Sequence, residues 1–439
     1  MRNLFARFKL LIVGILVLLV IGGAAGAYVF FAHAAKASPK YQTPEESDAY
    51  VRFDMEAYDK ILANYWMKPS DLNLPELYRL ALSKTASTTE TLPSSDRTGV
   101  AKMLGAAFKT ATSTDAERNM ALMVAQVVLY NMPPAGRDNL LSQKQETALR
   151  QEVSNINPTK DLYGDLGLAK GANADDVSKA AAAKTAELAA SSSPDAKAEL
   201  QQVAYAKQVL TNSNSKSLYD QSGIEPTVFP HIIGSTLYLY IDQIAPTTLQ
   251  EFALAVDNAS TTPGITSMIL DLRGNIGGAL DFLPAFFGLF MGQNQFTFDL
   301  YHQGDYQAQR STEPQFPDLT RYKEIAIETD DMTQSTAEDL TGTFKRFHLA
   351  HVVGTHTRGW GTVENTYPMD TVIDPSTTYA LLLVNSITLR DDNQPIEGRG
   401  VDPDVDTSQS GWQGKLSSYF NSPSLISALR QTAGASPLK

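Results

Sequence analysis

The chain contains no cysteine among its 439 residues. This absence excludes disulfide bonds, thiolate metal ligands and a cysteine nucleophile. Histidine is scarce as well, and no two histidines stand at the spacing of a helical metal motif with a carboxylate between them. We therefore expect no metal site and no bound cofactor. The six histidines are His33, His231, His302, His348, His351 and His356.

Positive charge is also in short supply. The chain has 36 Lys and Arg against 48 Asp and Glu, for a net charge of −12. Nucleic-acid binding needs clustered basic side chains that neutralise phosphates, and no basic stripe is present. We therefore expect no nucleic-acid partner.

A single long run lacks charge altogether. Residues 10–32 are dominated by Leu, Ile, Val, Gly and Ala, and about 20 such residues span a bilayer as a helix. The basic residues of the stub 1–9 precede the run, so the positive-inside rule places the stub in the cytoplasm and the bulk of the chain outside. The alternative is a cleaved signal peptide, because Ala32-His33-Ala34 fits a small-x-small cleavage pattern.

Residues 41–158 are predicted to be mainly helical. Thr43-Pro44-Glu45-Glu46 is typical of a helix start, with a Thr cap, Pro in the first turn and acids near the positive end of the helix dipole. Helical periods then run through 53–65, 77–82 and 98–150, with an interruption near Met132-Pro133-Pro134. Such stripes indicate core packing and assign no function.

Residues 159–226 have a distinctive order of elements. They begin with a Tyr163-x-x-Leu166-Gly turn, continue with an alanine-rich helix and another helix, and close with Tyr219-Asp-Gln-Ser-Gly223. This order resembles the J-domain of DnaJ-type co-chaperones. The His-Pro-Asp tripeptide through which J-domains stimulate their ATPase partner is missing, since the loop reads Ser191-Ser-Ser-Pro-Asp195. We expect a degenerate helical hairpin that acts as a spacer or docking module, and no chaperone partner.

Residues 227–407 change to short β-like runs that alternate with helical stretches. The predicted strands are 235–242, 265–272 and 322–327, with a helix over 247–258. The second run is almost continuously apolar, as in a buried, largely parallel sheet. The pattern predicts a layered α/β domain. A last helix is expected near 423–433, within the tail 408–439.

Five segments of this domain stand out by their composition and order. They are Asp271-Leu-Arg-Gly-Asn-Ile-Gly-Gly278, Gln334-Ser-Thr-Ala-Glu338, His351-Val-Val-Gly354, Gly359-Trp-Gly361 and Gly398-Arg-Gly-Val-Asp-Pro-Asp404. The same order is found in the carboxy-terminal processing, or tail-specific, serine peptidases. The chain resembles that family over most of 227–407, and residues 52–83 resemble its N-terminal helices. The resemblance implies a ClpP/crotonase-like core, with the J-like hairpin where the family usually carries a peptide-binding PDZ domain.

The resemblance also implies a serine nucleophile and a lysine general base. Ser335 falls on the nucleophile position, and Trp360 occupies the position of the base. An indole N–H donates but cannot accept a proton, and the family's accessory aspartate is replaced by Arg346. The oxyanion hole is expected from the backbone N–H groups of Gly277 and Thr336.

The local pattern around Ser335 has a second interpretation. Ser335-Thr-Ala-Glu338 also fits a helix capping box, in which Glu338 reaches back to the serine. Asp339 would then favour the helix dipole. Substitute groups near the site are Lys345, His356 and Arg358, of which the arginine stays protonated.

Two functional hypotheses follow. The first is a membrane-anchored, extracytoplasmic pseudoenzyme of the bacterial envelope that retains a polypeptide-binding groove. The second is an active serine endopeptidase, a hydrolase that uses Ser335 with a relocated base to process exported proteins. They differ in whether a proton acceptor lies within about 3 Å of the Ser335 hydroxyl oxygen.

Overall fold

The computed structural model describes residues 41–191 and 193–439. The predicted membrane segment 10–32 lies outside these residues, as does the stub 1–9. Within the described ranges, no helix combines the length and apolar composition needed to cross a bilayer.

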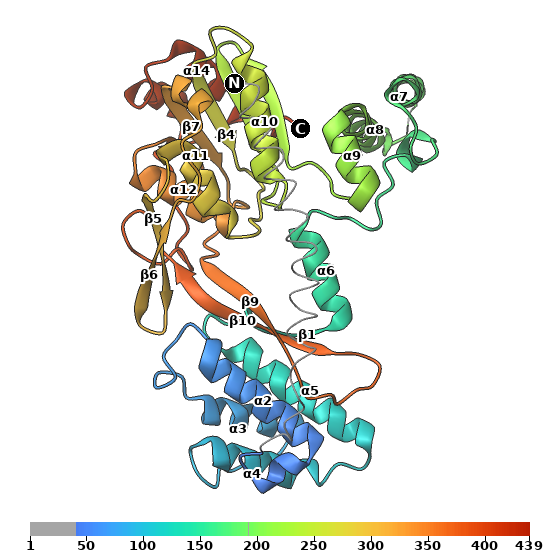
Figure 1. Cartoon of the computed structure of the whole chain (residues 1–439), viewed down its shortest axis with the longest axis vertical. Coiled ribbons are helices and arrows are strands. Elements are labelled where there is room, and N and C mark those ends of the chain that lie inside the picture. Colours follow the sequence, from blue (N-terminus) through green and yellow to red (C-terminus); the bar gives the residue numbers. More distant parts are fainter. Residues whose placement is uncertain (1–40, 192) are drawn as a thin grey trace.

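Four helices build the end of the molecule that is drawn in blue in Figure 1. They are α2 (Ala49–Asn64), α3 (Leu74–Ala86), α4 (Arg97–Phe108) and α5 (Thr114–Asn131). Large aromatic side chains such as Phe53, Tyr78 and Phe108 are buried in their common core. The predicted helical character of this region is confirmed, although Leu80 of the 77–82 stripe is exposed.

The first helix starts later than predicted. Thr43 precedes a short 3-10 turn, η1 (Pro44–Ser47), in which Glu46 reaches back to the Thr43 N–H. The α-helix begins only at Ala49 because Asp48 acts as its N-cap and accepts from the Tyr50 N–H at 2.8 Å. A side-chain oxygen on these first amides satisfies donors that the helix itself cannot.

A five-stranded sheet connects the helical region to the rest of the chain. Its central strand, β10 (Tyr379–Thr388), pairs antiparallel with β1 (Asn139–Ser142), β5 (Phe296–His302) and β9 (Thr362–Pro368), and β6 (Asp305–Arg310) pairs with β5. Leu381, Leu383 and Val384 of β10 belong to the same core as the helices.

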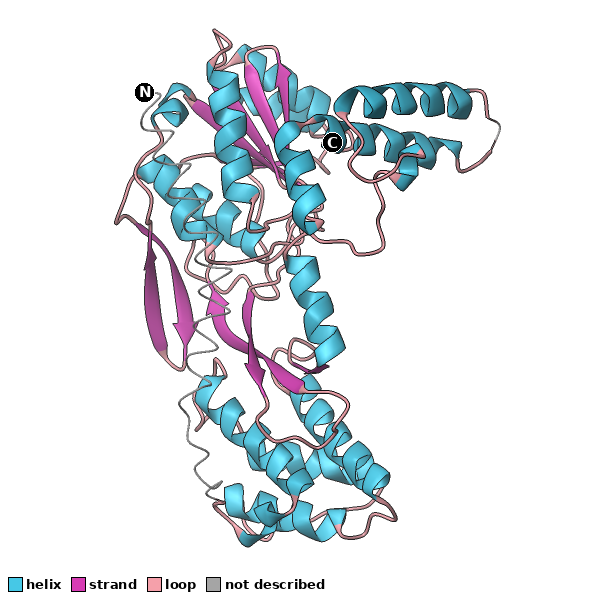
Figure 2. Cartoon of the chain, turned by 45° about the vertical axis from the view of Figure 1, so that its right-hand side comes forward, coloured by secondary structure: helices cyan, strands magenta, loops and turns pink. Residues whose placement is uncertain are grey.

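From β1 the chain continues through α6 (Gln143–Val153) to a helical hairpin that projects to one side (Figures 1 and 2). The predicted hairpin is confirmed as α7 (Ala174–Ala189) and α8 (Ala196–Thr211), with η2 (Gly164–Leu166) before it and α9 (Ser213–Ser222) after it. It has a small core of its own around Leu162, Val177 and Leu210.

The second sheet has six strands in the order β11-β8-β7-β4-β3-β2. All neighbouring pairs are parallel except β2 with β3. The predicted strands and their helix are confirmed within a few residues at each end. The strands are β2 (Val228–Ile233), β3 (Thr236–Ile241), β4 (Ser267–Asp271), β7 (Glu324–Thr329), β8 (His351–Gly354) and β11 (Val405–Asp406).

Helices cover both faces of this sheet, which confirms the layered α/β architecture. One face packs against α10 (Thr248–Ser260), α11 (Phe282–Met291) and α12 (Thr336–Arg346) around buried phenylalanines. The other face packs against α14 (Pro423–Thr432), the predicted last helix. The remaining short helices are η3 (Pro317–Arg321), α13 (Trp412–Lys415) and η4 (Leu416–Ser418).

A buried ion cluster ties α14 to the sheet. Arg273 lies 2.5 Å from Asp271 and 3.0 Å from Glu328, and it donates to the carbonyl oxygens of Thr432 and Ala435. Both carboxylates are fully buried, and a buried charge is stable only when it is paired and hydrogen-bonded. The residues Asp271-Leu-Arg273, which begin the first motif segment, therefore have a structural role next to the candidate site.

Candidate active site

Ser335 stands at a sharp turn between β7 and α12. As the N-cap of α12 it has φ +56° and ψ −129°, a backbone conformation that is costly for a residue with a side chain. The turn follows strand β7 in the chain. Within it, the Gln334 N–H donates to the Asn275 carbonyl at 2.9 Å. The turn is thereby held against the segment that follows β4.

That neighbouring segment brings Gly277 against the serine. Gly277 has φ +86°, and a Cβ at this position would lie 2.8 Å from Ser335 Cβ and 3.0 Å from Thr336 N. Only glycine fits there without displacement. The structure thus places Gly277 next to Ser335 and Thr336.

The two expected oxyanion donors differ in their present partners. Gly277 N–H donates to Asn275 Oδ1 at 2.8 Å. Thr336 lies at the first position of α12, where an amide has no intrahelical acceptor, and its hydroxyl donates to the Gly278 carbonyl at 2.8 Å. In this conformation the Gly277 N–H is engaged, so Thr336 is the one of the two expected donors that remains available.

Glu338 binds the backbone around the site with both carboxylate oxygens. Its Oε2 accepts Ser335 N–H at 3.0 Å and Trp360 N–H at 2.7 Å, and its Oε1 accepts the Thr357 hydroxyl at 2.5 Å and Gly359 N–H at 2.7 Å. Four donors use the approximately four lone-pair positions of a carboxylate. The Glu338 side chain therefore connects the Ser335 turn to the loop 355–361 by hydrogen bonds to both.

Burial and hydrogen bonding act in opposite directions on this carboxyl. Glu338 is fully buried, and burial raises its pKa, while the four donors favour its ionised form. The interpretation of Glu338 as cap partner of Ser335 agrees with this geometry. The predicted capping box is present, with the Ser335 side chain toward the Glu338 N–H and the Glu338 side chain toward the Ser335 N–H, although the Ser335 hydroxyl makes no capping hydrogen bond of normal geometry.

Trp360 is close to Ser335 through its backbone, because both amides donate to the same oxygen of Glu338. Its side chain is held elsewhere. Trp360 Nε1 donates to Glu364 Oε1 at 3.0 Å, and the Arg137 guanidinium carbon lies 3.5 Å from the centre of the indole ring. Burial raises the pKa of Glu364, while its hydrogen bonds from Thr362 and Trp360 oppose the rise.

The substitute groups that the sequence suggested have other partners. Lys345 lies at the far end of α12, roughly 15 Å along the helix from Ser335, 3.3 Å from Asp404. His356 is half exposed, and its Nε2 lies 3.4 Å from Asp402 Oδ1. Arg358 is exposed with its guanidinium 3.6 Å from Met332 Sδ. Across residues 41–191 and 193–439, no side chain forms a standard hydrogen bond with the Ser335 hydroxyl.

The other two positions named from the sequence also have structural partners. Arg346 donates to the Arg390 carbonyl. Asp339 is buried, and burial raises its pKa well above the usual range. Neither side chain is hydrogen-bonded to Ser335.

Sequence reasoning missed Arg137, Glu364 and Glu397. Arg137 comes from the loop after α5, in a region to which no function was assigned, and it pairs with Glu397 at 2.8 Å. Arg137 and Glu397 are 260 positions apart in the chain, so no local sequence pattern could connect them.

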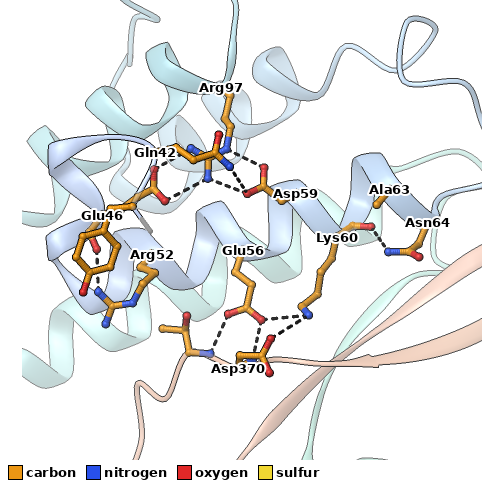
Figure 3. A pocket seen from close by; sticks show the side chains of 12 residues that line it. Gln42, Glu46, Arg52, Glu56, Asp59, Lys60, Ala63, Asn64, Arg97 and Asp370 are labelled. Atoms are coloured by element: carbon orange, nitrogen blue, oxygen red, sulfur yellow. Dashed lines mark hydrogen bonds and ion pairs between the residues drawn. The ribbon is translucent and has the colours of Figure 1, made fainter. Parts of the chain in front are cut away.

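A separate pocket of about 400 Å³ lies along α2, close to Asp370 and Thr371. Figure 3 shows that most of its charged side chains are paired with one another, whereas Arg52 donates to the backbone carbonyl of Glu46. Arg97 binds Glu46 and Asp59, and Lys60 lies between Glu56 and Asp370. This pocket contains none of the residues around Ser335. In the described part of the chain, no cluster of three potential metal ligands is present.

Comparison with known proteins identifies the domain around Ser335. Residues 235–407 match the sequence profile of peptidase family S41. This part of the chain is therefore similar to serine-type peptidases of family S41. The match includes β3 to β11 and all four predicted site residues, whereas the hairpin α7–α8 lies outside it.

Curated relatives match a limited part of the chain. A probable CtpA-like serine protease of Staphylococcus epidermidis is 28% identical over 180 residues, which are 41% of this chain and 35% of that protein. A protein of the same description from Staphylococcus saprophyticus is 28% identical over 153 residues, or 34% of this chain and 29% of its own length. The chain thus spans about a third of the length of the relatives it matches.

Two solved structures are similar at a low level. The photosystem II D1 C-terminal processing protease aligns with a TM-score of 0.47 and 14% identity, over 82% of this chain and 93% of its own. A lipoprotein from Streptococcus agalactiae gives a TM-score of 0.43 and 14% identity, over 87% and 98%. At these values neither structure bears on individual residues of this chain.

Proposed function

We propose that the chain is a membrane-anchored, extracytoplasmic member of the S41 family in which proteolysis is lost or strongly impaired and a polypeptide-binding groove is kept. The observation that carries this proposal is the absence, within the described residues, of a proton acceptor hydrogen-bonded to Ser335. A serine hydroxyl is a weak nucleophile unless a neighbouring base takes its proton.

The nearest candidate bases do not meet this need. Both oxygens of Glu338 are filled by four other donors, and the indole of Trp360 has no lone pair to offer. Lys345 and His356 are paired with Asp404 and Asp402. With a serine and an oxyanion donor but no base, the rate falls by several orders of magnitude.

Two features of the Ser335 turn support the binding part of the proposal. Ser335 keeps a strained backbone at the start of a helix, and Gly277 leaves room beside it. The Thr336 N–H at the helix start is placed to bind a carbonyl oxygen of a polypeptide, as helix N-termini bind negative charge. The same groove would receive peptide ends or exposed segments of exported proteins.

Within this proposal the hairpin of α7 and α8 acts as a spacer or docking module. The loop that joins the helices has serine before Pro194 where working J-domains have histidine. The hairpin therefore takes no part in recruiting an ATP-dependent chaperone.

One observation favours the alternative, an active endopeptidase with a relocated base. The strained conformation of Ser335 is the kind of backbone feature that active sites keep when it serves the chemistry. His356 belongs to the loop 355–361, which also supplies donors to Glu338. A shift of this loop would be needed to bring the imidazole to the serine.

Cleavage and binding by the full chain in detergent micelles test the proposal. The substrate is reduced and alkylated lactalbumin, and binding is followed with a fluorescent peptide. We expect binding without cleavage by the wild type. Trp360→Lys should gain slow cleavage, because a lysine would restore the base, and Ser335→Ala in that background should remove it.

Trp360→Phe serves as the matched control, since it alters the packing but adds no base. Cleavage by the wild type that disappears in Ser335→Ala would establish the alternative and sink the pseudoenzyme proposal. Absence of both cleavage and peptide binding would show that the groove is not preserved.

A further inference from the structure

The loop that follows α5 reaches from the helical region to the base position of the candidate site. Arg137 in this loop stacks on the Trp360 ring with its guanidinium carbon 3.5 Å from the ring centre. The same guanidinium pairs with Glu397 Oε1 at 2.8 Å. Arg137 and Glu397 are largely buried, with side-chain exposures of 17% and 15%. A guanidinium that stacks on an indole while it is desolvated forms one of the stronger cation–π contacts.

Glu397 extends this contact to the loop 355–361. Its second oxygen, Oε2, accepts Gly361 N–H at 2.9 Å. Gly361 follows Trp360, whose own amide binds Glu338 at 2.7 Å. Arg137 therefore holds the loop at two points, through the indole face and through the carboxylate that binds the next residue.

The loop in turn holds the Ser335 turn. Glu338 accepts from Gly359 N–H and Trp360 N–H on one side and from Ser335 N–H on the other. A continuous set of close contacts thus runs from Arg137 through Trp360 and Glu338 to Ser335. A cation at 137 would repel the protonated form of a lysine at 360, whereas it fits the electron-rich face of an indole.

We infer that Arg137 is a positioning residue through which the helical region fixes the Ser335 turn, by stacking on Trp360 and by orienting Glu397. The inference rests on the proposed function in one respect, namely that the fixed turn belongs to a polypeptide-binding site. It gives the tryptophan at the base position a physical role, as the contact point between two parts of the chain.

Fluorine NMR of the full chain in micelles tests the inference. The protein is labelled with 5-fluorotryptophan, and its three tryptophans give three signals, of which that of Trp360 is assigned by its loss in Trp360→Phe. In Arg137→Ala we expect the Trp360 signal to shift and to become more sensitive to exchange of H₂O for D₂O, because one face of the ring loses its cover. The Trp412 signal should stay in place.

Peptide affinity supplies the second measurement. Arg137→Ala is expected to weaken binding of the fluorescent peptide by roughly three- to thirtyfold, the range of a desolvated cation–π contact. Arg137→Lys keeps the cation and should restore much of the affinity and of the Trp360 signal. Arg79→Ala is the matched control, because Arg79 lies in the same helical region and pairs with Glu76 instead.

An unchanged Trp360 signal together with unchanged affinity in Arg137→Ala would overturn the inference. Equal losses in Arg137→Ala and Arg137→Lys would also contradict it, since the cation would then be irrelevant. If no variant binds peptide, the proposed function fails, whereas the Trp360 signal still decides whether Arg137 positions the indole.

Discussion

Gly277 is the residue on which the shape of the candidate site depends most directly. It combines a positive φ of +86° with a contact that leaves no space for a Cβ next to Ser335. We expect Gly277→Ala to lower the free energy of unfolding by about 2–4 kcal/mol, the sum of backbone strain and overpacking. Peptide binding should fall with it, because the Ser335 turn must move. Urea unfolding and peptide titration measure the two effects.

Gly264→Ala separates the contribution of the contact from that of the backbone. Gly264 has a similar φ of +82°, but a Cβ there would meet no atom within 4 Å. Its substitution should therefore cost only the strain of the backbone, about 1 kcal/mol. Equal costs at both positions would show that the close approach to Ser335 does not constrain the site.

At the scale of elements, helix α2 carries a carboxyl group on its buried face. Asp54 is fully buried, as are its neighbours in sequence, Phe53 and Met55. Neither of its carboxylate oxygens has a hydrogen-bond partner among the described residues. Burial raises the pKa of Asp54 well above its ordinary value of 3.8. The folded chain therefore holds a proton on Asp54 at a pH at which the unfolded chain has released it.

This difference gives the stability a defined pH dependence. Because the folded-state pKa is raised, the contribution of Asp54 is fully present below pH 3.8 and is lost as the pH rises through the raised value. Between pH 3.8 and the raised pKa of Asp54, the wild type should lose about 1.4 kcal/mol of unfolding free energy per pH unit relative to Asp54→Asn. Urea unfolding at a series of pH values measures the difference.

Asp59→Asn provides the comparison on the same helix. Asp59 pairs with Arg97 at 2.7 Å. Asp59→Asn removes this ion pair, so the variant should be less stable than the wild type and should show no relative gain in stability as the pH rises. A constant difference between Asp54→Asn and the wild type at all pH values would mean that Asp54 is ionised in the folded chain.

At the scale of the whole molecule, strand β10 links the helical region to the segment that carries the candidate site. Its apolar residues complete the core of the helical region, and its partner β9 follows directly after the loop that carries Trp360. Together with Arg137, this strand connects the helices drawn in blue in Figure 1 to the candidate site. The hairpin of α7 and α8 instead projects away with its own small core.

The projecting hairpin leads to a prediction about partners. We expect the full chain in micelles to leave the ATPase rate of a J-domain-dependent chaperone unchanged. Ser193→His, which completes a His-Pro-Asp tripeptide with Pro194 and Asp195, should not stimulate it either, because the charges of α7 are mixed where a basic face is required. A steady-state ATPase assay with an authentic J-domain as positive control measures this. Stimulation by the wild type would refute the spacer interpretation.

The sequence by itself determined most of the elements and named the candidate site residues. Periodicity predicted the helices and the buried strands because apolar spacing reflects which face of an element is covered. The resemblance of the ordered motifs to the peptidase family pointed to Ser335, Gly277, Thr336 and Trp360 as candidate site residues. The start of α2 was misplaced because two competing caps, Thr43 and Asp48, stand five residues apart.

Only the tertiary structure decided what surrounds those residues. The stacking of Arg137 on Trp360 and the four donors on Glu338 join segments that are distant in the chain. The burial of Asp54 likewise depends on helices that pack from elsewhere. Long-range contacts are set by the packing of whole elements, and a local pattern contains no information about which distant side chain will meet which partner.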